Sequence, residues 1–167
     1  MLTTVSILLT VVSNFWQLKG KLMAQNYWIL VASHEHVKNG VKEGIAQVCH
    51  GKAGPLKRIK KGDWILYYSS KEIFGEKEPC QKFTAIGQCM SEEPYQFDMG
   101  GGFVPFRKKI HYLKCTEAPI IPLIPQMTVI KNKARWGGAF RFGMLKIPHQ
   151  DFMMIANEMI NDISQIK

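Results

Sequence analysis

Acidic residues are few in this chain of 167 residues. There are 13 Asp and Glu against 22 Lys and Arg, which gives a formal net charge of +9 and a pI near 9.4. This excess of positive charge favours a polyanionic partner, either nucleic acid or an acidic membrane surface, although many basic proteins bind neither. Carboxylates are also sparse near the aromatic stretches, so the sequence gives little support for a paired general acid and base.

Cysteine is also scarce, and no cysteine motif is present. The chain has four cysteines, with no CxxC pair and no metal-ligand spacing: Cys49, Cys80, Cys89 and Cys115. Disulfide frameworks are typical of smaller, cysteine-rich secreted chains, so we expect reduced, buried thiols in a cytoplasmic protein. His34 and His36 are two residues apart and would lie on different faces of a helix. We therefore expect neither a metal nor a cofactor.

No apolar run is long enough to cross a bilayer, which needs about 20 residues. The run at residues 1–12 is shorter, and its first cations come after it, whereas a secretory signal carries positive charge in front. We expect Met23 to be the true start, residues 1–24 to be an extension outside the fold, and residues 25–167 to form one domain. A short amphipathic helix or a signal anchor is the alternative for the extension, and no membrane partner is expected for the domain.

Short apolar and aromatic runs separated by polar turns make up most of the chain and are typical of buried strands. We predict strands in these segments: Asn26–Ala32, Ile45–Val48, Trp64–Tyr68, Phe83–Cys89, Phe103–Leu113 and Phe140–Ile147. A short helix follows the first strand, with Ser33 as its N-cap. A second helix begins at Pro148 and has one apolar face: Phe152, Ile155, Ala156, Met159, Ile160 and Ile163. The predicted class is α+β, a mainly antiparallel, curved sheet or small barrel with peripheral helices.

Glycine and proline mark the irregular segments. Gly87 lies inside a predicted strand and indicates a bulge or a close backbone approach. The run Gly100–Gly102 is not followed by Lys-Ser/Thr, so we predict a turn and not a phosphate loop. Pro119, Pro122 and Pro125 break up the next stretch, which we expect to cross the surface with its apolar side chains inward: Ile120, Ile121, Leu123 and Ile124.

Of all parts of the sequence, the segment Ile45–Ser70 says most about the kind of ligand that the protein binds. It runs from an apolar strand through a polar turn with His50 and Lys52, then a basic loop, into an aromatic strand, and we predict one hairpin-sized unit. Cations beside aromatic rings at a strand end suit a ligand with negative charge and a flat face, such as a nucleotide. Cys49 and His50 are adjacent, so on a strand they would point to opposite faces, and Cys–His catalysis is not expected.

Base recognition needs aromatic faces for stacking and a few polar groups for the base edge. The aromatic candidates are Trp28, Tyr68, Phe97 and Trp136, and the polar candidates are Ser33, His50, Lys52 and Ser69. Trp28 and Tyr68 taken singly are more typical of a core, whereas Trp136 lies in a polar loop and is the strongest candidate. The basic clusters either contact a nucleic-acid backbone or form solvated faces: Lys57, Arg58, Lys60, Lys61, Arg107, Lys108, Lys109, Lys131, Lys133 and Arg135.

Short motifs follow one another along most of the chain: Asn26-Tyr27-Trp28, Val48–Lys52, Pro55–Arg58, Gly62-Asp63, Tyr67-Tyr68-Ser69, Phe74-Gly75, Gln81, Phe83–Gly87, Tyr95-Gln96, Met99, Pro105-Phe106-Arg107, Trp136-Gly137, Phe140–Gly143 and Asp151-Phe152. Taken together they resemble the EVE domain family. The resemblance covers about Gln25 to Ile160, and so many matches in order make it specific.

The resemblance implies a PUA-like fold, a mixed and largely antiparallel β pseudobarrel related to the YTH and ASCH domains, with a pocket for a modified base in RNA or DNA. By that likeness the pocket is built from Ser33 at the end of the first strand, the His50 turn, Tyr68–Ser69 and the segment Trp136–Arg141. YTH domains enclose a methylated base in a tryptophan cage. Here His50 stands after the second strand where that cage has Trp, so methyladenine specificity is not carried over.

We therefore predict a non-enzymatic module that extrudes one modified base into this pocket, with Arg141 as a further pocket residue. Two alternatives remain. One is a small hydrolase of modified nucleosides, similar to some ASCH domains, in which Lys52, Thr84 and Glu92 take the roles of the lysine, threonine and glutamate of those relatives. The other is a general basic RNA-binding adaptor in which the pocket has no ligand.

Overall fold

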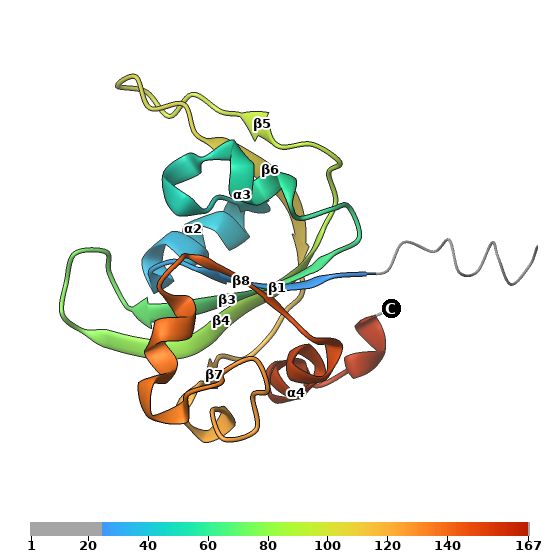
Figure 1. The fold of residues 1–167 in the computed structure, drawn as a ribbon. Helices are drawn as coiled ribbons and strands as arrows, with labels where there is room; N and C mark the ends of the chain where they lie inside the picture. Colours follow the sequence, from blue (N-terminus) through green and yellow to red (C-terminus); the bar gives the residue numbers. More distant parts are fainter. Residues whose placement is uncertain (1–24, 167) are drawn as a thin grey trace, which may run out of the picture.

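A computed structural model gives the structure of the protein and describes residues 25–166 (Figure 1). The prediction about residues 1–24 concerns residues outside this range. The strands are β1 (Tyr27–Val31), β2 (Ile45–Ala46), β3 (Trp64–Lys71), β4 (Pro79–Cys89), β5 (Tyr95–Gln96), β6 (Phe106–Tyr112), β7 (Ala118–Pro119) and β8 (Met144–Ile147). The α-helices are α2 (His34–Glu43), α3 (Ala53–Lys57) and α4 (His149–Met159), and the 3₁₀ helices are η1 (Cys49–Gly51), η2 (Ile121–Leu123), η3 (Lys133–Phe140) and η4 (Ile163–Gln165).

The strands form one curled sheet in the order β2-β6-β4-β3-β1-β8, with β5 paired to β6 and β7 paired to β4. β1 runs parallel to β3, and the other pairs are antiparallel. Both edge strands are short, since β2 has 2 residues and β8 has 4. The predicted α+β class is confirmed, with a PUA-like, largely antiparallel β pseudobarrel, peripheral helices and a C-terminal amphipathic helix.

β3 is apolar along most of its length because helices cover both of its faces. Trp64, Leu66 and Tyr68 point into a core shared with α4, whereas Ile65 and Tyr67 point into a core shared with α2 and α3. Figure 1 shows the same division, with α2 and α3 on one side of the sheet and α4 on the other. Side chains that are neighbours along β3 therefore belong to different layers of the protein.

The buried carboxylate of Asp63 joins the starts of β1 and β3. Its Oδ1 accepts from the backbone N–H of Asn26 at 2.9 Å and from the Asn26 side-chain amide at 3.1 Å. Its Oδ2 accepts from Trp28 Nε1 at 3.0 Å and from the backbone N–H of Lys60 at 2.9 Å. Hydrogen bonds to a charged acceptor are stronger than neutral ones, so this carboxylate is a firm attachment point.

This attachment supports the parallel register of the two central strands. In that register Tyr27 lies opposite Trp64, and Val31 lies opposite Tyr68. The C-terminal ends of β1 and β3 therefore lie side by side.

Replacing Asp63 with asparagine should lower the free energy of unfolding by about 2–3 kcal/mol. The amide has no charge, and its NH₂ group faces N–H donors that need an acceptor. Urea unfolding followed by fluorescence measures the change. Asp98→Asn is the matched control, because Asp98 bonds the backbone of Gly100 in an exposed turn, and it should change the value by less than about 0.5 kcal/mol. Equal effects of the two substitutions would contradict the role assigned to Asp63.

β4 departs from regular pairing where it passes the end of β3. The register shifts between Tyr67 and Tyr68 and again between Ser69 and Lys71, and each time β4 has one extra residue. Gln81, in the second of these bulges, has a φ of 55°, which is uncommon for a residue with a side chain. The bulges bend β4 beside the end of β3.

Gly87 has the close backbone approach that the sequence predicts. A Cβ at this position would lie 2.6 Å from Cγ2 of Ile110 and 2.8 Å from the carbonyl oxygen of His111. Only a residue without a side chain lets β6 pass this close to β4. The predicted turn at Gly100–Gly102 is also present, and all three of these glycines have positive φ.

The prediction that Ile45–Ser70 forms one hairpin-sized unit is wrong. β2 pairs with β6, and β3 pairs with β1 and β4. The chain between β2 and β3 forms η1 and α3 instead of a simple loop, and Cys49 and His50 both have positive φ. Because neither residue is a glycine, no sequence pattern indicates that the backbone is left-handed here.

Three smaller predictions also need correction. The strand predicted from Phe140 is confined to β8, because Phe140 ends η3 with its ring in the core. Ile121 is half exposed, whereas Ile120, Leu123 and Ile124 are buried, since the turn of η2 directs Ile121 outward. Ser33 is the N-cap residue of α2 as predicted, but its hydroxyl bonds Nδ1 of His36 at 2.9 Å and not a backbone N–H.

Candidate functional site

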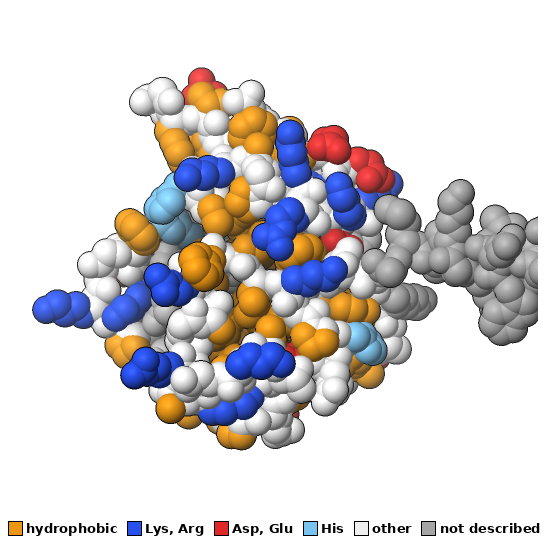
Figure 2. All heavy atoms as spheres, viewed as in Figure 1, with side chains coloured by type: hydrophobic (Ala, Val, Ile, Leu, Met, Phe, Trp, Pro, Cys, Tyr) orange, Lys and Arg blue, Asp and Glu red, His pale blue; other side chains and the backbone are white. Residues whose placement is uncertain are grey.

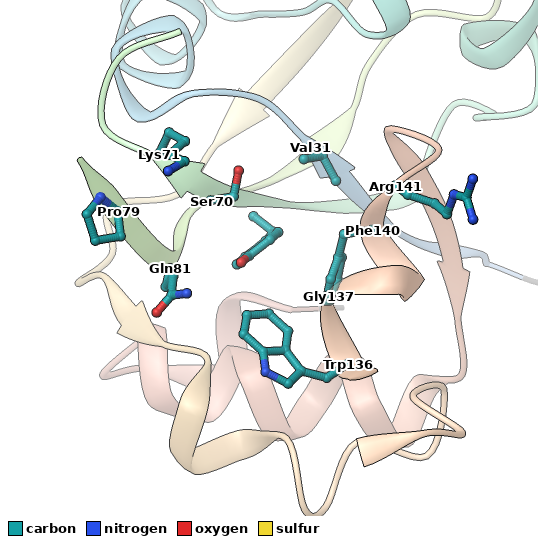
Figure 3. A pocket seen from close by; sticks show the side chains of 10 residues that line it. Val31, Ser70, Lys71, Pro79, Gln81, Trp136, Gly137, Phe140 and Arg141 are labelled. Carbon is teal, nitrogen blue, oxygen red and sulfur yellow. The ribbon is translucent and has the colours of Figure 1, made fainter. Parts of the chain in front are cut away.

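A cavity of about 390 Å³ lies at the adjacent C-terminal ends of β1 and β3. Its volume is in the range of about 300–1,000 Å³ that is common for small-molecule sites. The residues that line it come from β1, β3, β4, η3 and the residue after η3: Val31, Tyr68, Ser70, Lys71, Pro79, Gln81, Trp136, Gly137, Phe140 and Arg141 (Figure 3). Of the predicted pocket residues, Tyr68, Trp136 and Arg141 are brought together here.

Three aromatic rings pack against one another beside the cavity. The ring centroids of Tyr68 and Phe140 are 4.4 Å apart with a 37° tilt. Trp136 meets both rings nearly edge-on, at 6.3 Å from Tyr68 and 6.2 Å from Phe140. Figure 3 shows Trp136 across the cavity from Gln81. Because Trp136 is only partly buried, part of its surface remains available for contact with a flat ligand.

Three neutral polar side chains line the cavity. The Tyr68 hydroxyl and the side chains of Ser70 and Gln81 make no side-chain hydrogen bond within residues 25–166. Burial, and then the charge of Cys80, raises the pKa of Tyr68 to about 12, so the phenol stays protonated at neutral pH. A hydroxyl and an amide can each donate and accept, which suits the edge of a heterocycle.

Two cations complete the cavity. Lys71 donates to the carbonyl of Lys77 at 2.7 Å, which holds its ammonium on the β3–β4 turn. Arg141 lies on the opposite side, and its side chain is directed away from the centre of the cavity (Figure 3). The cavity therefore combines aromatic faces, neutral hydrogen-bonding groups and positive charge at its rim.

His34, the first residue of α2, lies between two carboxylates. Its Nδ1 is 2.7 Å from Glu72 and its Nε2 is 2.6 Å from Glu117, which also binds Lys82 at 3.0 Å. The hydrogen bond from His34 lowers the pKa of Glu72. Ligand atoms of His34, Glu72 and Cys80 lie within 4.8 Å of one another, and these are donor types that transition metals accept. The contacts with the carboxylates already use both ring nitrogens, so we interpret the cluster as an ion-pair network.

Burial, followed by the hydrogen bond and charge of Glu72, raises the pKa of Cys80 to about 11. Glu72→Gln removes that charge, so the pKa of Cys80 should fall and its thiolate fraction at pH 8 should rise. We expect alkylation of Cys80 by iodoacetamide, measured by peptide mass spectrometry, to become several-fold faster, up to roughly tenfold for each unit that the pKa falls. Glu76→Gln, in the exposed part of the same turn, should leave the rate unchanged. An unchanged rate in Glu72→Gln would rule out this electrostatic control.

The other predicted pocket residues lie elsewhere. Trp28 is 3% exposed in the α2–α3 core and donates to Asp63. Ser69 is fully buried and shares a 2.8 Å hydrogen bond with Thr84, because alternation along β3 turns it away from Tyr68 and Ser70. Neither side chain lines the cavity.

Ser33, His50, Lys52 and Phe97 also lie outside the cavity lining. His50 is exposed in η1, which touches the turn after Arg141, since Cys49 Sγ lies 3.6 Å from the carbonyl oxygen of Phe142. Because this segment is a 3₁₀ turn, the strand argument used against Cys49–His50 catalysis does not apply, although neither residue lines the cavity. Phe97 is half exposed beyond β5 with Arg107 over its ring at 4.1 Å.

Two residues that were predicted to contact a nucleic-acid backbone, Arg107 and Lys108, instead bind partners within the protein. Lys108 is fully buried and donates to the carbonyls of Ile59 and Glu92 at 2.6 and 2.8 Å. Arg107 is 4% exposed and pairs with Glu43 at 2.9 Å. Neither side chain can reach a phosphate in this conformation.

The remaining basic candidates are exposed: Lys57, Arg58, Lys60, Lys61, Lys109, Lys131, Lys133 and Arg135. Figure 2 shows Lys and Arg side chains spread among hydrophobic ones over the face in view, with few acidic side chains. Such a surface attracts polyanions.

The proposed hydrolase residues do not gather at the cavity. Thr84, in β4, shares a hydrogen bond with Ser69 of β3. Glu92 is exposed and lies 3.9 Å from Lys61. Lys52 is exposed after η1. None of the three lines the cavity. Within residues 25–166, no helix is both long and apolar enough to cross a bilayer.

Sequence reasoning missed several lining residues, and only some of them had a signal. Ser70 follows from Tyr68 by strand alternation, and Val31 follows once β1 and β3 are paired. Pro79 and Gln81 had no signal, because the β4 bulge that positions them depends on the tertiary structure. Phe140 lies in the segment Trp136–Arg141 that the resemblance assigned to the pocket, but it was predicted to lie in a strand and not in a helix beside Trp136.

A family model described as "EVE domain" matches residues 26–158. The chain is 48% identical over 128 residues to the "UPF0310 protein in gntR 5'region" of Bacillus licheniformis, which is 77% of this chain and 87% of that protein. It is 49% identical over 135 residues to the UPF0310 protein msl3206 of Mesorhizobium japonicum, which is 80% of this chain and 91% of that protein.

Two solved structures have the same fold. The NMR structure of Rpa0253 from Rhodopseudomonas palustris matches with a TM-score of 0.50 at 16% identity, over 80% of this chain and 92% of that one. The crystal structure of PSPTO5229 from Pseudomonas syringae matches with a TM-score of 0.50 at 11% identity, over 78% of this chain and 97% of that one. At such identities the likeness concerns the fold alone.

Proposed function

The chain belongs to the EVE domain family, and from that premise we propose that it binds RNA or DNA and holds one modified base in the cavity between β3 and η3. The observation that carries the proposal is the combination, in one cavity, of three packed aromatic rings and unpartnered polar groups. A purely apolar cavity would suit a lipid or a hydrocarbon, whereas this lining suits a flat ring with a polar edge.

Stacking supplies the main attraction in this proposal. Trp136 offers a large ring that is held by Tyr68 and Phe140, so little freedom is lost when a base packs against it. Base–aromatic stacking is worth about 1–3 kcal/mol per base. That amount offsets much of the few kcal/mol needed to take a base out of its stack.

Hydrogen bonds select the base. Ser70, Gln81 and the neutral Tyr68 hydroxyl can contact its edge. A substituent on the base then fills part of the cavity that a plain base leaves empty. The exposed lysines and arginines attract the phosphate backbone without regard to sequence.

The proposal is for binding without catalysis. No described carboxylate, histidine or cysteine lines the cavity. Ser70 and Lys71 are the lining side chains that could act as nucleophiles, and no described side chain is hydrogen-bonded to Ser70 as a base that would activate it. Incubation with acylated and alkylated cytidines, followed by product analysis, should return each nucleoside unchanged. Release of the modifying group at a rate above the uncatalysed one would favour the hydrolase.

Trp136→Ala should weaken binding of an oligonucleotide with a recognised modified base by about 5- to 150-fold, as expected for the loss of one stacking contact. Binding of the same oligonucleotide without the modification should change little. A panel of modified nucleosides, screened by thermal stabilisation, identifies the base. Fluorescence anisotropy with short labelled oligonucleotides then measures both affinities. Trp136→Phe, which keeps a ring, should retain most of the preference.

Arg135→Ala is the contrasting variant, because Arg135 is an exposed neighbour of Trp136. This substitution should weaken the binding of modified and plain oligonucleotides equally, and it should reduce the dependence of the affinity on salt concentration. The wild-type preference for the modified base should persist at high salt. If the preference disappears at high salt, the protein is a general basic adaptor. If the preference survives Trp136→Ala, the cavity is not the site that selects the base.

A further inference from the structure

Phe142 is a large aromatic side chain with no place in either core. It is 76% exposed, although it lies one residue after the cavity residue Arg141. A single exposed hydrophobic side chain is common on protein surfaces, so the inference about Phe142 rests on its fixed position beside the cavity and next to Arg141.

The backbone that carries Phe142 is held from three sides. Its carbonyl oxygen accepts from Cys49 Sγ at 3.6 Å. The next residue, Gly143, donates to Phe140 at 3.2 Å and accepts from Val31 at 2.9 Å. Gly143 has a φ of 76°, and a Cβ there would lie 3.1 Å from Cys49 Sγ. The ring of Phe142 is therefore presented to solvent by a fixed turn.

Arg141 links this ring to the cavity. It lines the cavity, and its guanidinium carbon lies 5.1 Å from the centroid of the Phe142 ring. Figure 3 shows that its side chain leads outward from the cavity. A guanidinium over an aromatic ring at the rim offers a stacking surface and a positive charge at one place.

We propose that Phe142 and Arg141 form a second subsite, which stacks the base next to the one in the cavity and binds its phosphate. The ligand is then a single strand of nucleic acid and not a free nucleoside. This inference rests on the proposed function, because the cavity fixes which base is the neighbour. When one base enters the cavity, its backbone crosses the rim, and the adjoining base loses a stacking partner that Phe142 replaces.

The test compares three probes on wild type, Phe142→Ala and Phe103→Ala. The probes are free 5-methylcytidine, a pentanucleotide with 5-methylcytidine between uridines, and the same pentanucleotide with plain cytidine; N4-acetylcytidine replaces 5-methylcytidine if it stabilises the protein better. Phe103 is the matched control, since it is 46% exposed at the turn between β5 and β6 and lies outside the cavity lining. Thermal unfolding checks that the variants are folded.

Phe142→Ala should weaken both pentanucleotides by about 5- to 150-fold and leave the affinity for the nucleoside unchanged, because stacking on an exposed ring tolerates any base. Phe103→Ala should change none of the three. The subsite is overturned if Phe142→Ala leaves the pentanucleotides unaffected, or affects them no more than Phe103→Ala does.

Failure of the proposed function gives a different result. If Phe142→Ala weakens both pentanucleotides while wild type does not prefer the modified one, the stacking subsite stands and base selection by the cavity fails.

Discussion

The hydrogen bonds that Asp63 accepts at the start of β3 are the constraint on which the rest of the structure depends. They tie the first residues of β1 to the first residues of β3, and so they support the parallel pair at the centre of a largely antiparallel sheet. Parallel strands end at the same edge of a sheet, which is where α/β proteins commonly bind ligands. In this fold the same geometry places Val31 beside Tyr68, and the cavity lies there.

The two-layer arrangement explains how one strand serves both stability and binding. Helices on both faces bury β3 as far as Ser69, and beyond that point the strand continues into the cavity with Ser70 and Lys71. The bulges in β4 fall at this transition, where they bend the sheet away from regular pairing. Along β3 the exposed polar residue Ser70 and, in the facing β4, the strained residue Gln81 therefore lie at one end of an otherwise apolar strand pair.

The sequence predicted the parts of the fold that depend on local pattern. Apolar runs located β1, β3, β4 and α4, and Gly87 indicated the close contact between β4 and β6. The polar loop around Trp136 identified one wall of the cavity. The rest depends on long-range contacts. The pairing of β2 with β6, the left-handed residues Cys49 and His50, and the bulge at Gln81 have no local signal. Buried cations such as Lys108 are indistinguishable in sequence from exposed ones, because a lysine is buried only when carbonyls from other segments meet its ammonium.

The short strands at the two edges of the sheet have a consequence for how the protein behaves at high concentration. β2 offers 2 residues and β8 offers 4, so the open edges present few backbone groups to a neighbouring molecule. A long, flat edge would recruit further copies by strand addition and lead to aggregates. Short edges of this kind reduce the tendency of a basic protein with exposed apolar side chains to add further copies strand by strand.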